Sequence, residues 1–466
     1  MNKKFLVIVL GVLFAFVLVG CVNASPDEDE DDAINTNTDQ ITEVFTQEED
    51  SNISVIEGVS TVTLADYSDE FKSAELDCTY EVDATIDLST IDGTYNITEK
   101  GTYEFTGDAT DVQIVVDTEE KVHIVLNGIN VTNDSMAFIY VKSSDKAYIT
   151  SAENTINNIV VTGDIAAVED EELDGTIYSK DDIVFNGTGV INITSSKNGI
   201  SGNDDVKVCD GTLNITATKH GISGNDSIRI TSADITIIAG KDGLHSDNDD
   251  LDSYVYIQDG SLNITSSDQA ISVCSDFTMK DGLLTINSSD EGIQAATINI
   301  LGGTIDINAV EDGLNASSDV ANIYINIVGG EITIYSTSDG LDSNGDLYIS
   351  GGYTKIVQLG DDNSPINYDG ESSVTGGILI AVGSTRMSED TYSDIQGTIQ
   401  TAISSNGDIA LKDSDGNLIA AISTDIAYEM IYVTAPELVL DNTYSIVTLS
   451  VTTDITLTSL NYNDVD

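Results

Sequence analysis

The sequence contains no tryptophan, few prolines and few cysteines among its 466 residues. The three prolines stand at Pro26, Pro365 and Pro436, so most of the chain can form long ladders of paired β-strands without interruption. No Cys/His pair is spaced for a zinc site or for nucleophilic catalysis. After residue 21 the chain shows neither helical periodicity of useful length nor an apolar run that could span a membrane, so a helical fold is not expected.

Basic residues are also scarce, with 17 Lys and Arg against 80 Asp and Glu and a formal net charge of −63. This charge repels nucleic acid and excludes it as a direct partner. Aspartate outnumbers glutamate, which favours short carboxylates carried on turns, the hard oxygen ligands that suit calcium. The alternative explanation is the solvated acidic surface of a protein from a saline habitat.

One sequence phrase recurs between Ile183 and Gly352. Each copy has two runs of alternating apolar and polar residues around a Gly turn, and it ends in a charged turn closed by Gly-Ile or Gly-Leu. A repeat of this length is typical of solenoid proteins. The closing turn residue, which recurs at steps of 21, 22 or 27 residues, is Gly199, Gly221, Gly243, Ala270, Gly292, Gly313 and Gly340.

The alternation inside each copy has the period of a β-strand. Stacking the copies produces three apolar columns, which predicts three short strands in each rung of about 22 residues. One rung cannot bury its own apolar face, but a stack of rungs buries a continuous core. The sequence therefore predicts an all-β fold, a parallel β-helix. The column after the closing turn holds Ile200, Ile222, Leu244, Ile271, Ile293, Leu314 and Leu341.

The N-terminal segment, residues 1–21, is an apolar run that ends in Leu-Val-Gly-Cys21 and resembles a bacterial lipobox. The resemblance implies cleavage before Cys21, a lipid on its sulfur, and a mature protein held outside the cytoplasm on the cell membrane. An ordinary signal peptide cut nearby is the alternative. Residues 22–56 are acidic and polar, which predicts a disordered tether.

Two further regions follow the tether. We expect the β-helix to occupy residues 57–397, with less regular rungs before Asp174 because terminal repeats must cap the core. Residues 398–466 have a different pattern, in which Gly turns separate alternating runs. That pattern predicts antiparallel hairpins that form a small C-terminal β cap or β domain.

Carboxylates gather at the closing turns, where equivalent positions of successive rungs stack about 4.8 Å apart. At that spacing two carboxylates repel one another, so the ladder has a reason to recruit divalent cations. The insertion from Asp242 to Asp252 is the best single candidate for a calcium loop, although it does not match the EF-hand spacing. The predicted metal ligands are Asp242, Asp247, Asp249, Asp250, Asp290, Glu291, Glu311, Asp312, Asp339 and Asp342.

Three of the few lysines, Lys197, Lys219 and Lys241, share one column on consecutive rungs. A cationic ladder beside a calcium-holding ladder suits a polyuronate chain, because its carboxylates can meet lysine directly or through calcium. Neutralisation of neighbouring acids is the alternative role of these lysines. Other candidate carbohydrate-binding residues in the same phrases are His220, His245, Asn203 and Asn225.

The lipobox, the acidic tether and the repeated phrases KHGISGND and KDGLHSDND together resemble the clostridial-type carbohydrate-binding β-helix proteins, which are similar in fold to the pectate-lyase-like polysaccharide lyases. The resemblance covers roughly Gly58 to Gly370. It implies a right-handed parallel β-helix, bound calcium, and binding of cellulose or acidic pectic polysaccharide at the cell surface. Other cell-surface proteins are further expected partners.

Two other functions stay open. A calcium-dependent polysaccharide lyase would need a base, for which Lys241 is the candidate, but short rungs and near-absent arginine favour a non-catalytic binding protein. A surface adhesin would use the outward asparagines and threonines, such as Asn192 and Asn214. Sugar stacking would need exposed aromatic rings on one flat side. The available rings are Tyr254, Tyr256, Tyr324, Tyr335, Tyr348 and Tyr353.

Overall fold

The computed structural model describes residues 62, 64–248, 252–318, 322–387, 389 and 391–465. The expected lipid acceptor Cys21, the expected tether, and the candidate ligands Asp249 and Asp250 lie outside the described residues. In the described part of the chain, no helix is both long enough and apolar enough to cross a membrane. All elements named below belong to one compact unit, Ser60–Asp466.

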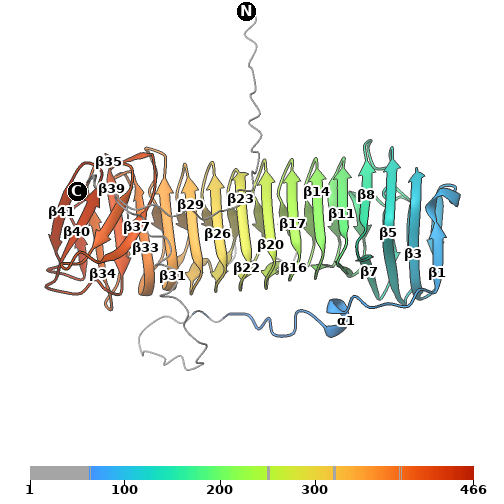
Figure 1. The fold of residues 1–466 in the computed structure, drawn as a ribbon, viewed down its shortest axis with the longest axis horizontal. Coiled ribbons are helices and arrows are strands. Elements are labelled where there is room, and N and C mark those ends of the chain that lie inside the picture. The colour runs from blue at the N-terminus through green and yellow to red at the C-terminus, as the bar shows by residue number, and fades with distance from the viewer. Residues whose placement is uncertain are drawn as a thin grey trace, which may run out of the picture. The chain divides into compact units, whose positions relative to one another are not determined.

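The Ser60–Asp466 unit is a parallel β-solenoid, as the repeat predicted (Figure 1). It is all-β with 2% helix, and it has about 13 turns of about 23 residues each. Each regular rung contributes three strands, and each strand pairs in parallel with the equivalent strand of the next rung. The solenoid therefore has three faces, here called the first, second and third face.

The strands of each face follow the order of the rungs. The first face holds β7 (Lys146–Ser151), β10 (Ile183–Gly187), β13 (Asp205–Val208), β16 (Ser227–Ile230), β19 (Tyr254–Ile257), β22 (Asp276–Met279), β25 (Thr297–Ile300) and β28 (Tyr324–Ile327). The second face holds β8 (Ile156–Val161), β11 (Val190–Ser195), β14 (Thr212–Ala217), β17 (Asp234–Ala239), β20 (Ser261–Ser266), β23 (Leu283–Ser289), β26 (Thr304–Ala309) and β29 (Glu331–Ser336). The third face holds β2 (Thr94–Ile97), β4 (Gln113–Asp117), β6 (Ile139–Ser143), β9 (Gly175–Ser179), β12 (Asn198–Gly202), β15 (Ile222–Gly224), β18 (Leu244–Ser246), β21 (Ile271–Val273), β24 (Ile293–Ala295), β27 (Leu314–Ala316), β30 (Leu341–Ser343) and β32 (Ile366–Tyr368).

Strands at the two ends of the stack complete the sheet that joins the first and second faces. Four of them are longer than the strands of the regular rungs. These end strands are β1 (Ala84–Asp87), β3 (Gly101–Thr110), β5 (Lys121–Asn133), β31 (Asp346–Gln358) and β33 (Ser372–Gly383). The described helices are α1 (Ser73–Leu76) and the 3-10 helix η2 (Leu88–Thr90).

The predicted columns form the core of the solenoid. The column after the closing turn is in register from Ile200 to Leu341, and its side chains are fully buried. The first-face column from Val206 to Leu347 is likewise in register and buried. One continuous stack of Ile, Leu, Val and Phe thus supplies the hydrophobic stabilisation that no rung could supply alone.

The closing glycines are required by close contact between rungs. A Cβ at Gly221 would lie 2.4 Å from Cγ2 of Ile237 and 2.6 Å from the carbonyl oxygen of Gly243. Ala270 occupies the equivalent turn position in its own rung. The second-face strand that follows it, β23, has a bulge after Ile286 where its pairing shifts. The bulge moves that strand out of the regular register.

The C-terminal part contains antiparallel hairpins, as its Gly turns predicted, and one parallel pair, between β34 and β42. β36 pairs with β37 and with β40, and β40 pairs with β41, all antiparallel. β39 pairs antiparallel with β33 and so covers the last rung. The strands of this part are β34 (Gly397–Thr401), β35 (Ser405–Asn406), β36 (Ile409–Lys412), β37 (Leu418–Ile422), β38 (Ala427–Tyr428), β39 (Met430–Ala435), β40 (Thr443–Thr448), β41 (Thr452–Thr456) and β42 (Asn461–Asn463).

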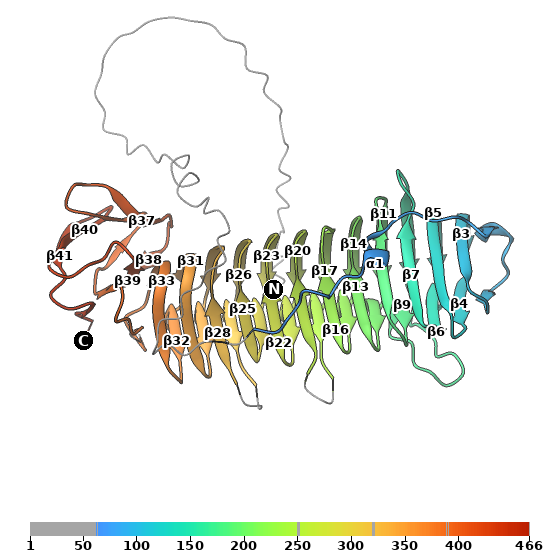
Figure 2. The ribbon, with the colours of Figure 1, turned by 90° about the horizontal axis from the view of Figure 1, so that it is seen from below.

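The described residues before β1 do not form a rung. Residues 64–80, here called the strap, run along the outside of the first face, and Figure 2 shows the blue segment with α1 crossing its strands. Glu75 of the strap is 1% exposed and pairs with Lys207 of β13 at 3.0 Å and with Lys146 of β7. Asn186 of β10 donates a hydrogen bond to the Glu75 carbonyl oxygen at 3.0 Å.

The N-terminal half of the strap contacts later rungs. Glu70 pairs with Arg229 of β16 at 2.8 Å. The ring of Tyr67 stacks on Tyr256 of β19, with centroids 4.4 Å apart and planes 10° apart, and its hydroxyl donates to Asp276 of β22. The strap therefore crosses six neighbouring strands, and the buried charge of Glu75 is balanced by lysines of the solenoid.

Candidate functional site

Two columns of polar residues lie side by side on the outside of the third face. One column is the residue before each closing turn: Asn198, His220, Asp242, Gln269, Glu291, Asp312 and Asp339. The other column is the outward residue of each short strand, and its members are in register: Ser201, Ser223, His245, Ser272, Gln294, Asn315, Asp342 and Asn367. Stacking of successive rungs thus concentrates these side chains on one surface.

The C-terminal half of this surface carries a group here called the acidic cluster, which consists of Glu291, Asp312, Asn315, Asp339 and Asp342. Asp312 Oδ1 accepts a hydrogen bond from the Asp339 backbone N–H at 2.8 Å. Asp339 in turn accepts hydrogen bonds from the next rung, so it is fixed in place. Donors of the following rung therefore hold the carboxylates of Asp312 and Asp339 in place.

Two oxygens of the acidic cluster are buried without a hydrogen-bond partner among the described residues, namely Glu291 Oε2 and Asn315 Oδ1. Burial, and then the neighbouring carboxylates, raise the pKa of Glu291 to about 7 and that of Asp342 to about 7. The same burial and the Asp312 charge raise the pKa of Asp339 to about 6. Oxygen atoms of crowded carboxylates are the kind of ligand that a hard divalent cation such as calcium prefers.

The other predicted calcium ligands lie outside this cluster. Asp290 and Glu311 are exposed, and the Glu311 backbone N–H donates to the Asp290 carbonyl at 2.8 Å, so they form a ladder along the turns. Asp247 is exposed. Asp252, at the end of the predicted calcium loop, accepts a hydrogen bond from the Asn248 side chain at 2.8 Å.

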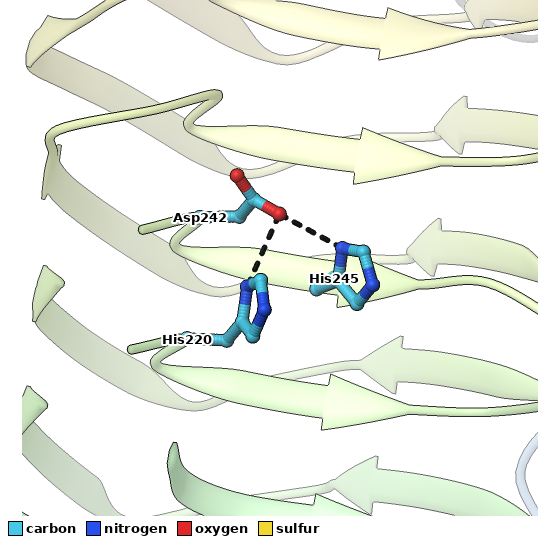
Figure 3. A group of neighbouring side chains, drawn as sticks. All are labelled: His220, Asp242 and His245. Carbon is cyan, nitrogen blue, oxygen red and sulfur yellow. Dashed lines mark hydrogen bonds and ion pairs between the residues drawn. The ribbon is translucent and has the colours of Figure 1, made fainter. Parts of the chain in front are cut away.

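Asp242 contacts two imidazoles (Figure 3). It is 3% exposed, and its Oδ2 lies 2.8 Å from Nδ1 of His245 and 3.1 Å from Nδ1 of His220. Burial alone would raise the pKa of Asp242, but the two imidazoles hold it below its ordinary value. The structure thus joins one predicted metal ligand to two predicted carbohydrate-binding residues.

The three stacked lysines differ in their surroundings. Their backbones form a ladder from Lys197 to Lys219 to Lys241. Lys197 Nζ donates to the carbonyl oxygens of Ile165 and Leu173 at 3.1 and 2.9 Å, so its charge is directed to the backbone. Lys219 and Lys241 are exposed and lie at the edge of the third face, where they can meet an anionic ligand.

Asn203 and Asn225 are exposed at the turns between the third and first faces. The Asn225 side chain donates a hydrogen bond to Asp226 at 3.1 Å. On the second face, the side-chain amides bond to one another: Asn214 donates to Asn192 at 2.9 Å, and Asn192 donates to Asn158 at 2.8 Å. Their hydrogen bonds therefore hold neighbouring rungs together.

The tyrosines do not form one free platform. Tyr254 and Tyr256 lie on the first face and are covered by Tyr67 of the strap. Tyr353 donates to the Ala421 carbonyl oxygen at 2.7 Å, so the C-terminal part covers it. The C-terminal part also accepts a hydrogen bond from Tyr335, at the Ser423 carbonyl oxygen. Tyr324 and Tyr348 remain as a T-shaped pair on the first face. These tyrosines are therefore not gathered on one flat side, as stacking on sugar rings would need.

Sequence reasoning missed the strap and Asn315. Lys146, Lys207 and Arg229 stand in strands that look alike in sequence, and nothing in the strands indicates that Glu70 and Glu75 would neutralise them. Asn315 could have been found, because it is the polar residue between two apolar ones after the closing turn.

A family model described as carbohydrate-binding domain-containing protein matches residues 91–297 and 284–428. The chain belongs to this carbohydrate-binding domain family. A relative from Acetivibrio thermocellus, also described as a carbohydrate-binding domain-containing protein, is 35% identical over 127 residues, which is 26% of this chain. The aligned region spans 44% of that relative's length.

A solved structure, the gadolinium derivative of the polysaccharide lyase-like protein from C. thermocellum, also matches. The identity is 24%, and the match covers 61% of this chain and 93% of that chain with a TM-score of 0.29.

Proposed function

We propose that this chain is a cell-surface lipoprotein that binds acidic plant-type polysaccharide of the pectic kind, with calcium between its carboxylates and those of the glycan. Membership of the carbohydrate-binding domain family supports the glycan. The acidic cluster carries the calcium part, because Glu291 Oε2 and Asn315 Oδ1 are buried oxygens without a partner among the described residues.

Glu291, Asn315 and Asp342 are the residues that would hold the ion, with Asp312 and Asp339 supplying nearby charge. When bound, calcium neutralises the carboxylates and offers its remaining coordination positions to a uronate carboxylate. Backbone N–H groups of the following rungs hold the carboxylates of Asp312 and Asp339 in place beside these residues. Exposed Lys219 and Lys241 would then attract the glycan at the same face.

Lipidation of Cys21 and the tether of residues 22–56 complete the proposal, and both lie outside the described residues. They would place the binding face away from the membrane. Other cell-surface proteins remain proposed partners. Replacement of Cys21 by Ser should move the protein from the membrane fraction to the soluble fraction of exported protein.

The proposal is tested with residues 22–466, which keep the whole Ser60–Asp466 unit. Retention on polygalacturonate and on cellulose is measured with calcium and with chelator. We expect calcium-dependent retention on polygalacturonate. The double variant Glu291→Gln with Asp342→Asn should weaken calcium binding at least about tenfold, because affinity follows the number of charged ligands.

The matched control is Asp306→Asn with Glu371→Gln, which removes the same charge away from the acidic cluster. Equal loss in both variants would show that net charge alone governs binding, and unchanged calcium affinity in the first variant would refute the site. Retention on cellulose alone, with or without calcium, would refute the acidic glycan.

A lyase would reveal itself in the same experiment by the ultraviolet absorbance of an unsaturated product. In that case the exposed Lys241 would be the base to replace first. We propose binding without cleavage, so no new absorbance is expected.

A further inference from the structure

The group formed by His220, Asp242 and His245 is chemically different from the acidic cluster. His220 and Asp242 precede the closing turns of consecutive rungs, and His245 is the outward residue of β18. Each residue offers one ligand atom, and the three atoms all lie within 4.8 Å of one another. Two nitrogens and a carboxylate oxygen thus meet on the third face (Figure 3).

Asp242 is held in place from its other side as well. In the amide orientation that satisfies its neighbours, the Gln269 side-chain nitrogen donates to Asp242 Oδ1 at 3.1 Å and to Asp268 Oδ1 at 3.0 Å. Oδ2 is therefore the oxygen that faces the imidazoles. This support fixes the carboxylate before any ligand binds, as the outer partners of metal-bound carboxylates do.

His220 Nδ1 is a buried nitrogen whose contact with Asp242 Oδ2, although 3.1 Å long, does not have the angles of a hydrogen bond. No other partner for this atom is present among the described residues. A buried imidazole nitrogen that lies beside a carboxylate without forming a hydrogen bond to it is available as a metal ligand. His245 Nδ1, by contrast, forms a hydrogen bond with the same oxygen at 2.8 Å.

Imidazole nitrogen selects zinc, cobalt, nickel and copper over calcium, which prefers oxygen ligands. Two imidazoles and one carboxylate are also the number of protein ligands in zinc sites that keep an open position. The ring planes are 21° apart, so one ring must turn for both nitrogens to reach one ion. His245 has the room to turn, because its side chain is 29% exposed against 13% for His220.

We propose that His220 Nδ1, His245 Nδ1 and Asp242 Oδ2 form a binding site for one divalent transition-metal ion of the zinc type. The site is separate from the acidic cluster and takes a different class of ion. A water molecule or a glycan oxygen would reach a bound ion from the side of His245, whose side chain is the most exposed of the three. Binding requires neutral imidazoles, so the ion releases the protons that they carry.

The test is titration of residues 22–466 with Co²⁺ and with Zn²⁺ in the presence of excess calcium, followed by visible spectroscopy and calorimetry. We expect one equivalent of each ion to bind. Co²⁺ should give the weak visible bands of nitrogen and oxygen ligands without the intense thiolate band that Cys78, Cys209 or Cys274 would add.

The chain has three histidines, so His123, the one outside this group, provides a matched control. His220→Gln and His245→Gln should each weaken zinc binding at least about tenfold. His123→Gln should leave it unchanged, because His123 contacts Thr150 on the first face, in β7. Calcium affinity should not change in any of these variants, which separates this site from the proposed glycan-binding ion.

Three outcomes would overturn the inference: no zinc binding in excess calcium, equal binding in His220→Gln with His245→Gln and in the unchanged chain, or a thiolate band. Circular dichroism of each variant checks that the solenoid is intact. Because His245 is an outward residue of a short strand, we expect the His245→Gln variant to fold even if the His220→Gln variant does not fold.

Discussion

The buried carboxylate of the strap gives the sharpest test of what holds the strap in place. Glu75→Gln keeps the shape of the side chain but removes the charge that Lys146 and Lys207 share. Loss of one partner from a buried ion pair costs about 3–5 kcal/mol. Lys146 keeps Asp182 at 3.2 Å and Lys207 keeps the Glu70 carbonyl oxygen at 2.7 Å, so the lower end, about 3 kcal/mol, is expected.

This cost should appear in opening of the strap and not in unfolding of the solenoid, because the rungs keep their own backbone pairing when the strap leaves. The amides to follow are those of Glu75, Leu76 and Asp77, which donate to backbone oxygens within and before α1. About 3 kcal/mol corresponds to about a hundredfold faster hydrogen exchange at these amides. Mass spectrometry of peptides that span α1 measures the change.

Glu81→Gln is the control, because Glu81 is an exposed acid that follows the strap closely in sequence. Faster exchange in both variants, or in neither, would refute the role of Glu75. The lysines hold the pKa of Glu75 below its ordinary value of 4.5 despite its burial. A carboxylate with a lowered pKa stabilises the folded state above pH 4.5. This stabilisation is lost as the pH falls through the pKa of Glu75 in the folded state, so acid should also open the strap.

Two further predictions concern the third face and the turns. Glu291 and Asp342 have pKa values raised to about 7 from ordinary values of 4.5 and 3.8, so the folded state binds more protons than the unfolded chain. In chelator, the free energy of unfolding should therefore fall as the pH rises from about 5 to about 7. Urea titrations of the double variant Glu291→Gln with Asp342→Asn should show a weaker dependence on pH. The same dependence on pH in the variant and in the unchanged chain would contradict the raised pKa values of these two residues. Gly221→Ala should lower the free energy of unfolding by about 1–3 kcal/mol, because the new methyl group meets Ile237 and a backbone oxygen, and a thermal midpoint equal to that of the unchanged chain would contradict this.

The rungs could be predicted because their signal repeats. The column from Ile200 to Leu341 carries the same alternation in every rung, and each copy strengthens the assignment of the others. The antiparallel C-terminal hairpins followed from Gly turns between alternating runs. Residues 64–80 have no such alternation, and their place was expected to be an irregular rung.

The candidate site could be predicted only in part. His220 and Asp242 share a column, so their proximity on consecutive rungs was available from the sequence, but the convergence of His245 on the same oxygen was not. Whether a carboxylate is buried or exposed depends on its angle to the face, and sequence alone does not separate Glu291 from Asp290. The tyrosines were also ambiguous, because covering by the strap is a tertiary effect.

The strap has a mechanical consequence. Its contacts at Tyr67, Glu70 and Glu75 lie in series along the stack, on β22, β16 and then β13 and β7. A pull on the chain ahead of residue 64 therefore loads Tyr67 first and reaches the buried ion pairs of Glu75 last. Under load the strap would detach one contact at a time, and the strand pairing of the rungs beneath it would stay intact.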